Sequence, residues 1–399
     1  MSLMKTLMNS DEVAWLPLID VCDLITTGKV NAHHMEEDGI YPFFTCHKKP
    51  YKINNYAFDF EAILISGNGS QTGHLNYYNG KFNAYQRTYV VGKFKKNILA
   101  MYLYHYLSGN LRKYINKHSK KGAVPYITMP MLANFSIPIP CPNNINKSMD
   151  IQNEIVRILD TFTELATELA TELRLRQKQY MYYRDNLLKF NKEGVRPHLL
   201  DKLLGDVDVE YLPLGEIASI KTGGSVSKQK IADNPGDYPV INSGRKPLGF
   251  INEWNTENEP LGVTTRGSVG SITWQEGKYF RGNLNYSISI KKQFNVKDRY
   301  LYHLLLFLQR DILNVCTFDA IPALNANNLK RILIPIPCPD NAKKSLNIQS
   351  NIVNNLDKFD MLINSISDGL PREIELRHKQ YEYYRDLLFD FPKPKADVA

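Results

Sequence analysis

The chain is 399 residues long, a length that favours two or three domains, and hydrophobic residues make up 43% of it, enough for well-packed cores. Its formal net charge of +8 favours an anionic partner only weakly, because many soluble proteins are as basic. The five cysteines form no C-x-x-C pair, which argues against a zinc site and a disulfide framework and predicts a reducing, cytoplasmic location. The apolar runs are far shorter than the roughly 18 residues of a membrane span, which argues against a transmembrane helix.

Residues 1–147 are predicted to form a first globular α/β domain. A short strand is expected at residues 15–18, entering a helix at residues 19–21. A buried strand is expected at residues 62–65, and a helix at residues 99–114, where apolar side chains recur with helical spacing. The buried strand runs into a Gly-rich turn at residues 66–73, which is typical of a surface loop.

A long helix is predicted after the proline-rich stretch at residues 137–142, whose prolines suit an extended connector and not a central strand. Apolar residues then recur at steps of three and four without an intervening Pro or Gly, as in one helix of a coiled coil. Such a rod would be roughly 64 Å long and needs a partner for its seam. The predicted seam consists of Ile151, Ile155, Ile158, Phe162, Leu165, Leu169, Leu173, Tyr180, Tyr183, Leu187 and Phe190. Residues 148–205 are assigned to this spacer helix and its linker.

The remaining sequence repeats this plan, with a second globular domain predicted at residues 206–343 and a second spacer helix at residues 344–399. A helix carried twice in one chain predicts an intramolecular antiparallel pair, although two unrelated surface helices remain an alternative. The matches are Lys178-Gln179-Tyr180 with Lys379-Gln380-Tyr381 and Tyr182-Tyr183-Arg184-Asp185 with Tyr383-Tyr384-Arg385-Asp386. We therefore expect an α+β fold in which two similar α/β domains are separated by an antiparallel coiled coil of two long helices, as a pseudo-two-fold tandem duplication.

The second helix departs from the first at Ser367-Asp368-Gly369-Leu370-Pro371. Proline lacks a backbone donor and disfavours the helical conformation of the residue before it, so we expect a kink or break there.

The two globular domains differ most at residues 31–79 and 227–275, which hardly match apart from Gly69-Ser70 beside Gly267-Ser268. Shared parts indicate common architecture, and unlike parts indicate two different tasks of one kind. The pattern predicts a bipartite recognition device.

These features together resemble the specificity subunits of type I restriction-modification systems over nearly the full length. The marks are the duplicated plan, the two Ile-Pro-Ile-Pro connectors, the two Tyr-Tyr-Arg-Asp helix ends and the Thr-Glu-Leu-Ala repeats that begin at Thr163. The resemblance implies two target-recognition domains, each binding one half of a split, asymmetric site on double-stranded DNA. It also implies that two methyltransferase subunits dock on the spacer and that restriction subunits join the complex.

The Thr-Glu-Leu-Ala repeats are predicted to set the distance between half-sites. Each tetrad lengthens a helix by about 6 Å, nearly two base pairs of DNA. Deleting residues 167–170 should therefore change the spacer and leave the half-sites unchanged, unless the repeats are only a helix-favouring surface.

Direct base reading needs Arg or Lys on guanine and Asn or Gln on adenine, and phosphate binding needs basic loops. The candidates are Lys48, Lys49, Gln71, Arg87, Lys120 and Lys121 in the first domain, and Lys228, Lys230, Arg245, Lys246, Arg266 and Arg281 in the second. Lys120-Lys121 is the preferred phosphate site. Each of these side chains also has a simpler interpretation as a solvated charge.

The helix ends hold the candidate partner contacts. Tyr180, Tyr183, Tyr381 and Tyr384 are expected to pack as core. The charged residues Arg184, Asp185, Arg385 and Asp386 are expected to face outward. The resemblance implies that these four contact the methyltransferase subunits or the opposite domain.

No catalytic, cofactor or metal site is predicted. The glycines near Gly69 lack the spacing of a dinucleotide-binding loop, His33-His34 has no companion ligands, and His105 and His303 suit core histidines. We therefore expect a non-catalytic DNA-recognition subunit without cofactors. Two alternatives remain: a structural coiled-coil assembly protein with duplicated protein-binding domains, and a self-sufficient methyltransferase or nuclease.

Overall fold

The chain divides into two compact units, Met1–Ala170 with Glu373–Ala399 and Thr171–Arg372. The computed structural model describes residues 13–118, 126–190, 196–244, 246–318, 322–364 and 369–392. Within these ranges no helix is both long and apolar enough to cross a membrane. Helix α5 (Ile145–Leu188) is unbroken, and the boundary between the units falls inside it.

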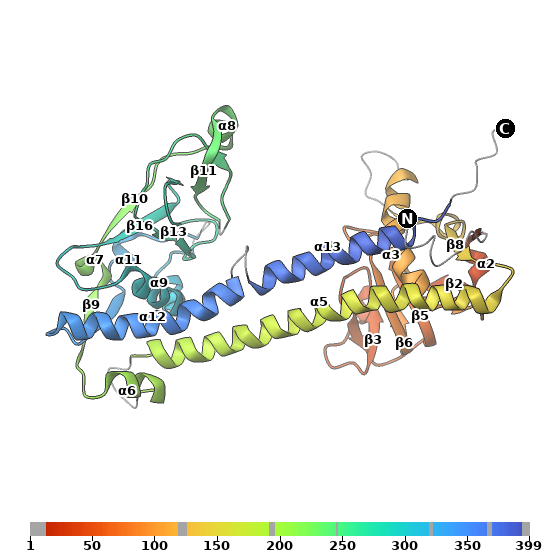
Figure 1. The fold of residues 1–399 in the computed structure, drawn as a ribbon, viewed down its shortest axis with the longest axis horizontal. Coiled ribbons are helices and arrows are strands. Elements are labelled where there is room, and N and C mark those ends of the chain that lie inside the picture. The colour runs from red at the N-terminus through yellow and green to blue at the C-terminus, as the bar shows by residue number, and fades with distance from the viewer. Residues whose placement is uncertain are drawn as a thin grey trace. The chain divides into compact units, whose positions relative to one another are not determined.

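The first unit combines a six-stranded sheet with helices (Figure 1). Its strands are β1 (Val13–Pro17), β2 (Cys22–Thr27), β3 (Tyr41–Phe44), β4 (Tyr51–Ile53), β5 (Phe58–Ser66), β6 (Leu75–Ala84), β7 (Thr88–Phe94) and β8 (Ser136–Pro140). Its helices are α2 (Leu18–Val21), η1 (Ala32–His34), α3 (Ala100–His118), α4 (Met129–Ala133), the first part of α5, and most of α13 (Leu370–Leu388).

Strand β5 is central in the first unit, where the strand order is β2-β7-β5-β6-β3-β4. Ile63 and Ile65 of β5 are fully buried and belong to one core with Leu103 of α3, which confirms the predicted buried strand and helix. The Ile-Pro-Ile-Pro stretch forms β8, which pairs only with β1. A two-stranded ribbon consists of edge strands, where a missing proline N–H is tolerated.

The second unit has the same plan with smaller sheets. Its strands are β9 (Val209–Pro213), β10 (Ala218–Thr222), β11 (Pro235–Ile241), β12 (Phe250–Ile251), β13 (Leu261–Thr264), β14 (Ile272–Trp274), β15 (Phe280–Arg281), β16 (Asn285–Ile290) and β17 (Leu333–Pro337). Its helices are the rest of α5, α6 (His198–Leu204), α7 (Leu214–Ile217), α8 (Lys228–Asp233), α9 (Asp298–Phe307), α10 (Gln309–Asn314), α11 (Ala326–Leu329) and α12 (Ala342–Asn364). Ribbon β9–β17 repeats ribbon β1–β8, and the two larger sheets have the orders β10-β16-β13-β14 and β12-β11-β15.

Each unit contains an antiparallel pair of spacer helices. In the first unit α5 and α13 run side by side in opposite directions, and Phe162 stacks on Tyr384 with ring centroids 5.0 Å apart (Figure 1). In the second unit α5 packs against α12, and Tyr183 stacks on Phe359 with centroids 5.2 Å apart. Tyr183 and Tyr384 therefore pack in the coiled coil, as predicted.

The second spacer helix is two helices, as the proline suggested. Helix α12 ends at Asn364 and α13 begins at Leu370, with Pro371 in its first turn. Proline suits that position because the first N–H groups of a helix have no intrahelical partner. The predicted Ser367-Asp368 part of the break lies outside the described residues.

The predicted seam of α5 is partly wrong. Leu165 is 38% exposed, whereas its neighbour Ala166 is 7% exposed, and Leu159 rather than Ile158 is fully buried. A helix turns once per 3.6 residues, so leucines spaced by four drift away from a fixed contact line. The Thr-Glu-Leu-Ala repeats therefore place alanine against the partner at this turn.

On each spacer helix, a buried glutamine forms hydrogen bonds with the backbone of the globular part that precedes the helix. Gln152 Oε1 accepts the N–H of Leu99 at 3.0 Å, and its amide nitrogen donates to the carbonyl of Asn97 at 2.9 Å. Gln349 repeats both bonds, at 2.9 Å to the N–H of Lys297 and 2.8 Å to the carbonyl of Asn295. The duplication thus includes the joint between globular part and helix.

Candidate nucleic-acid interface

Several predicted DNA-binding residues of the first unit lie in turns at one end of its sheet. Strand β5 ends at the same edge where β6 and β7 begin, because β5 is antiparallel to both. Gln71 is half-buried in the β5–β6 turn, and Arg87 is exposed in the β6–β7 turn.

The turn between β3 and β4 comes to the same place. Cys46 Sγ lies 3.2 Å from Asn68 Oδ1, and His74 Nε2 lies 3.3 Å from the carbonyl oxygen of Lys48. Burial lowers the pKa of His74 below its usual 6.5, so this ring is neutral at pH 7. Lys48 and Lys49 are exposed in this turn, and the structure therefore brings four predicted residues into one neighbourhood.

An open hollow of about 330 Å³ lies between these turns. Its lining includes Thr27, Asn68, Gln86, Arg87, Tyr89 and Tyr126. Sequence reasoning found Arg87 but missed Asn68, Gln86 and Tyr126. The available signal was Gly69-Ser70, which recurs as Gly267-Ser268 where the two domains otherwise differ. Lys120, Lys121 and Arg245 lie outside the described residues.

The described candidates of the second unit lie on several different elements. Lys228 and Lys230 belong to α8, where Lys230 forms an ion pair with Glu253 and lies 4.7 Å from the centre of the Phe280 ring. Lys246 is exposed between β11 and β12, and Arg266 is exposed in the turn after β13.

Arg281 is buried, and its prediction as a DNA contact is therefore wrong. The residue is 2% exposed, and its guanidinium donates to the carbonyls of Glu259 at 2.6 Å and Tyr286 at 3.1 Å and to the side chains of Asn285 and Tyr279. Burial lowers its pKa to about 10. A buried arginine with this many bonds holds β13 and β16 together and is not free to meet a phosphate or a base.

The prediction that the helix-end arginines face outward is also wrong. The side chain of Arg385 is 11% exposed and bonds to Asp386 at 2.8 Å. It also packs against Gly109 of α3, where a Cβ added to the glycine would lie only 2.5 Å from Arg385 Nε. Arg184 is 23% exposed, bonds to Asp185 at 2.8 Å, and lies 5.8 Å from the ring of Phe307 in α9.

Each arginine therefore packs on the globular part of its own unit, which agrees with the opposite-domain alternative. Asp185 and Asp386 are half-exposed, at 51% and 52%.

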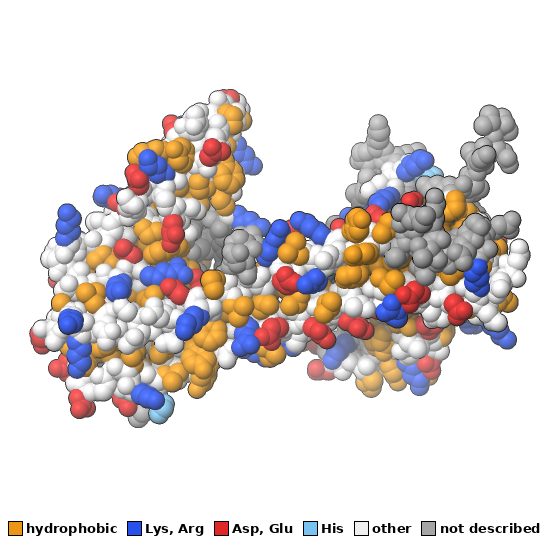
Figure 2. Space-filling model, viewed as in Figure 1, with side chains coloured by type: hydrophobic (Ala, Val, Ile, Leu, Met, Phe, Trp, Pro, Cys, Tyr) orange, Lys and Arg blue, Asp and Glu red, His pale blue; other side chains and the backbone are white. Residues whose placement is uncertain are grey.

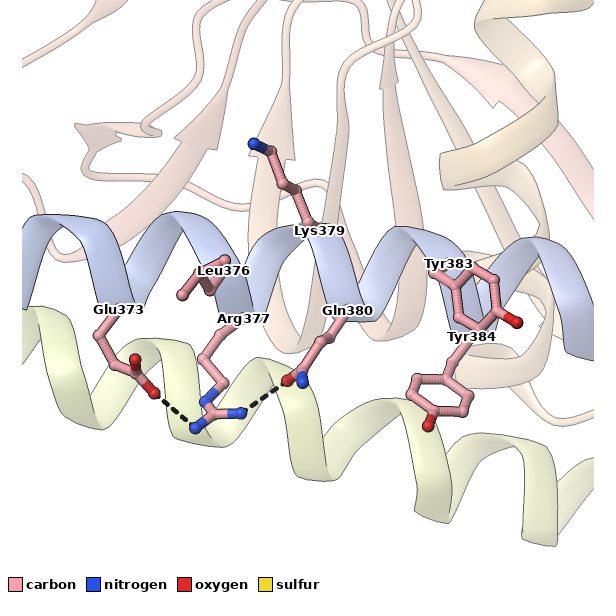
Figure 3. A pocket seen from close by; sticks show the side chains of 7 residues that line it. All are labelled: Glu373, Leu376, Arg377, Lys379, Gln380, Tyr383 and Tyr384. Carbon is pink, nitrogen blue, oxygen red and sulfur yellow. Dashed lines mark hydrogen bonds and ion pairs between the residues drawn. The ribbon is translucent and has the colours of Figure 1, made fainter. Parts of the chain in front are cut away.

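A shallow hollow lies along α13, and Figure 3 shows the side chains that line it. Arg377 lies at its centre, bonded to Glu373 and Gln380 on neighbouring turns. Leu376 and Tyr383 flank this polar group and are 37% and 65% exposed.

The same apolar pair recurs on α5. Leu175 and Tyr182, which correspond to Leu376 and Tyr383 in the matched helix segments, are 51% and 61% exposed. Sequence reasoning missed both pairs because it considered only the seam of the helix and assigned no role to Leu175, Tyr182, Leu376 and Tyr383. The chain thus presents one apolar face in two copies.

The paired histidines lie at the joints between globular parts and helices, as predicted for core residues. His105 is 1% exposed, with Nε2 2.8 Å from Asp160 and Nδ1 2.9 Å from Tyr381 Oη. His303 is fully buried, with Nε2 2.7 Å from Asp357, and its Nδ1 has no hydrogen-bond partner among the described residues. Burial lowers the pKa of both rings.

Charge on the visible surface is mixed. On the face drawn in Figure 2, Lys and Arg side chains alternate with Asp and Glu. Among the described residues, no group of three or more His, Cys, Asp or Glu side chains is arranged to hold a metal ion.

Known proteins share this architecture. A model of the type I restriction modification DNA specificity domain matches residues 11–176 and again residues 206–376. The chain is 33% identical to the type I restriction enzyme EcoR124I/EcoR124II specificity subunit of Escherichia coli, covering 99% of this chain and 98% of that protein. It is 30% identical to a putative type I restriction enzyme specificity subunit of Haemophilus influenzae, over 97% and 98% of the two chains.

Two solved structures have the same fold. The S subunit of a type I restriction-modification system from M. genitalium matches with a TM-score of 0.64 and 19% identity, over 99% of this chain and 100% of that one. A chain from a study of assembly and conformational transition in a type I system matches with a TM-score of 0.51 and 14% identity, over 94% and 97%. With both copies of the family domain present, the chain belongs to the specificity subunits of type I restriction-modification systems.

Proposed function

We propose that this chain is the non-catalytic DNA-recognition subunit of a type I restriction-modification complex, and that each globular part binds one half of a split DNA site. The observation that carries the proposal is the repeat of one architecture with unlike surface turns. Ribbon β1–β8 and the Gln152 joint recur as ribbon β9–β17 and the Gln349 joint, whereas Asn68 and Arg87 are not repeated. The domain boundaries 1–147, 148–205, 206–343 and 344–399 belong to this proposal, as does its cytoplasmic location.

The partners follow from the second duplication. Two copies of one exposed apolar face, Leu175 with Tyr182 and Leu376 with Tyr383, suit two copies of one protein. We assign them to two methyltransferase subunits, with Asp185 and Asp386 at the margin. Restriction subunits then join the assembled complex.

Mapping methylated adenines in the genome of a host with and without this chain tests the function. The expected result is a chain-dependent motif of two unlike half-sites separated by a fixed number of unspecified bases. A continuous motif would contradict split recognition. A methylation pattern that does not depend on the chain would favour a structural assembly protein.

A further inference from the structure

Each unit contains a junction at which several of its own surface segments meet. The backbone of this junction is the same in both units, although its side chains differ. In the first unit the N–H of Gly67, after β5, donates to the carbonyl of Arg87, before β7, at 2.9 Å. The N–H of Ile127 donates in turn to the carbonyl of Gly67 at 2.9 Å. Three segments far apart in sequence are thus fixed together.

The second unit repeats these bonds. The N–H of Thr265, after β13, donates to the carbonyl of Leu284, before β16, at 2.9 Å. The N–H of Leu324 donates to the carbonyl of Thr265 at 3.0 Å. The glycines that end both turns, Gly69 and Gly267, have positive φ angles of 81° and 72°, a conformation that glycine adopts without strain.

These bonds define which positions correspond. We call the two sets the strand-end junctions: Asn68, Arg87 and Tyr126 in the first unit, and Arg266, Leu284 and Ala323 in the second. All six side chains are exposed or half-buried, and the first set lines the hollow of about 330 Å³. Side chains differ completely at matched positions on a matched backbone, as expected of two readers with different targets.

We infer that the strand-end junctions are the places where the two units read bases, which rests on the proposed function. An asparagine amide pairs with the N6 and N7 edge of adenine, and a guanidinium pairs with the O6 and N7 edge of guanine. The corresponding positions Asn68 and Arg266 therefore select adenine in one half-site and guanine in the other. Arg87 adds a second guanine contact to the first half-site.

The remaining positions support this difference. Tyr126 is 51% exposed and presents an aromatic ring with a hydroxyl beside Asn68, to which it is joined by a backbone bridge. Leu284 and Ala323 present only apolar groups, which suit the methyl group of thymine. The first junction is thus the more polar reader.

A motif assay on the assembled methyltransferase complex tests the inference, with a DNA library randomised in both half-sites. Asn68→Ala should lose roughly tenfold or more of the preference for adenine at one position of one half-site. Arg266→Ala should lose a similar preference for guanine in the other half-site only. Arg266→Asn should change that preference from guanine to adenine.

The controls are Asn79→Ala on the exposed surface of β6 and Arg310→Ala on α10, which remove the same groups away from the junctions. Thermal unfolding and complex assembly of each variant show that it is folded. If Asn68→Ala and Arg266→Ala leave the motif unchanged, the inference is overturned. The proposed function still holds in that case, provided that the unaltered chain gives a split motif. Absence of a split motif in the unaltered chain would instead reject the proposed function.

Discussion

At the scale of single residues, the most constrained polar groups are the two buried glutamines. Gln152 and Gln349 are both 0% exposed, and each also bonds to a serine one turn earlier in its helix. Their amides satisfy backbone groups at the start of the neighbouring helix, where intrahelical partners are missing. These residues therefore stabilise the joint between globular part and helix.

We predict that Gln152→Leu destabilises the chain by about 2–3 kcal/mol, because it leaves a buried N–H and a buried carbonyl without partners. Urea unfolding should show a lower midpoint for this variant. The matched control is Asn153→Leu at the exposed neighbouring position, which should change the midpoint little. Equal midpoints for the two variants would contradict this role.

The buried histidines predict a dependence of stability on pH. Burial lowers the pKa of His105 and His303 in the folded chain, so the unfolded chain takes up these protons first as the pH falls below about 6.5. The stabilisation is therefore present above pH 6.5 and is lost as the pH falls towards the lower, folded-state pKa.

The double variant His105→Gln, His303→Gln should lose less stability than the unaltered chain between pH 7.5 and 5.5, as measured by urea midpoints. His34→Gln, at an exposed position, should behave like the unaltered chain. If the double variant and the unaltered chain lose the same amount, the buried histidines do not set the pH dependence.

At the scale of elements, periodicity predicted more than composition did. The long apolar repeat correctly predicted α5, and Pro371 correctly predicted that the second spacer segment is divided into α12 and α13. The burial of Ala166 instead of Leu165 could not be predicted, because it depends on which turn of the partner helix lies opposite. The burial of Arg281 could not be predicted for a similar reason, because the sequence does not show which backbone carbonyls will surround an arginine side chain in the folded chain.

The duplicated apolar faces lead to a prediction about assembly. The double variant Leu376→Ser, Tyr383→Ser should bind one methyltransferase subunit instead of two, because each face holds one copy. Leu175→Ser with Tyr182→Ser should have the same effect, and all four changes should abolish binding. Native mass spectrometry of the complex measures the number bound.

The matched control replaces two exposed apolar side chains away from the spacer, Ile40→Ser with Tyr51→Ser. That variant should bind two methyltransferase subunits. Two subunits bound to the variant with all four changes would place the docking surface elsewhere.

At the scale of the whole molecule, the sequence showed the duplication and predicted different tasks for the two domains, but it did not indicate where each domain would read DNA in the proposed function. The constant sequence offsets between the two repeats located the ribbons, the helices and the joints, because these segments have similar residues in both halves of the chain. The strand-end junctions were hidden because their side chains differ, and the sequence match beside them is confined to Gly69-Ser70 and Gly267-Ser268. The backbone bonds of the folded chain were needed to bring Asn68 and Arg266 into correspondence.

In the proposed function, α5 is the spacer between two readers. Its Thr-Glu-Leu-Ala repeats surround residue Ala170, where the first unit ends and the second begins. Removing one tetrad shortens a helix by about 6 Å, close to two base pairs, and leaves both junctions intact.

The most direct measurement is the methylation motif of the complex when the chain lacks residues 167–170, determined on a library with gaps of varied length. The account predicts a shorter gap, by one or two base pairs, between the same two half-sites. An unchanged gap, or a change in the half-site sequences themselves, would contradict it.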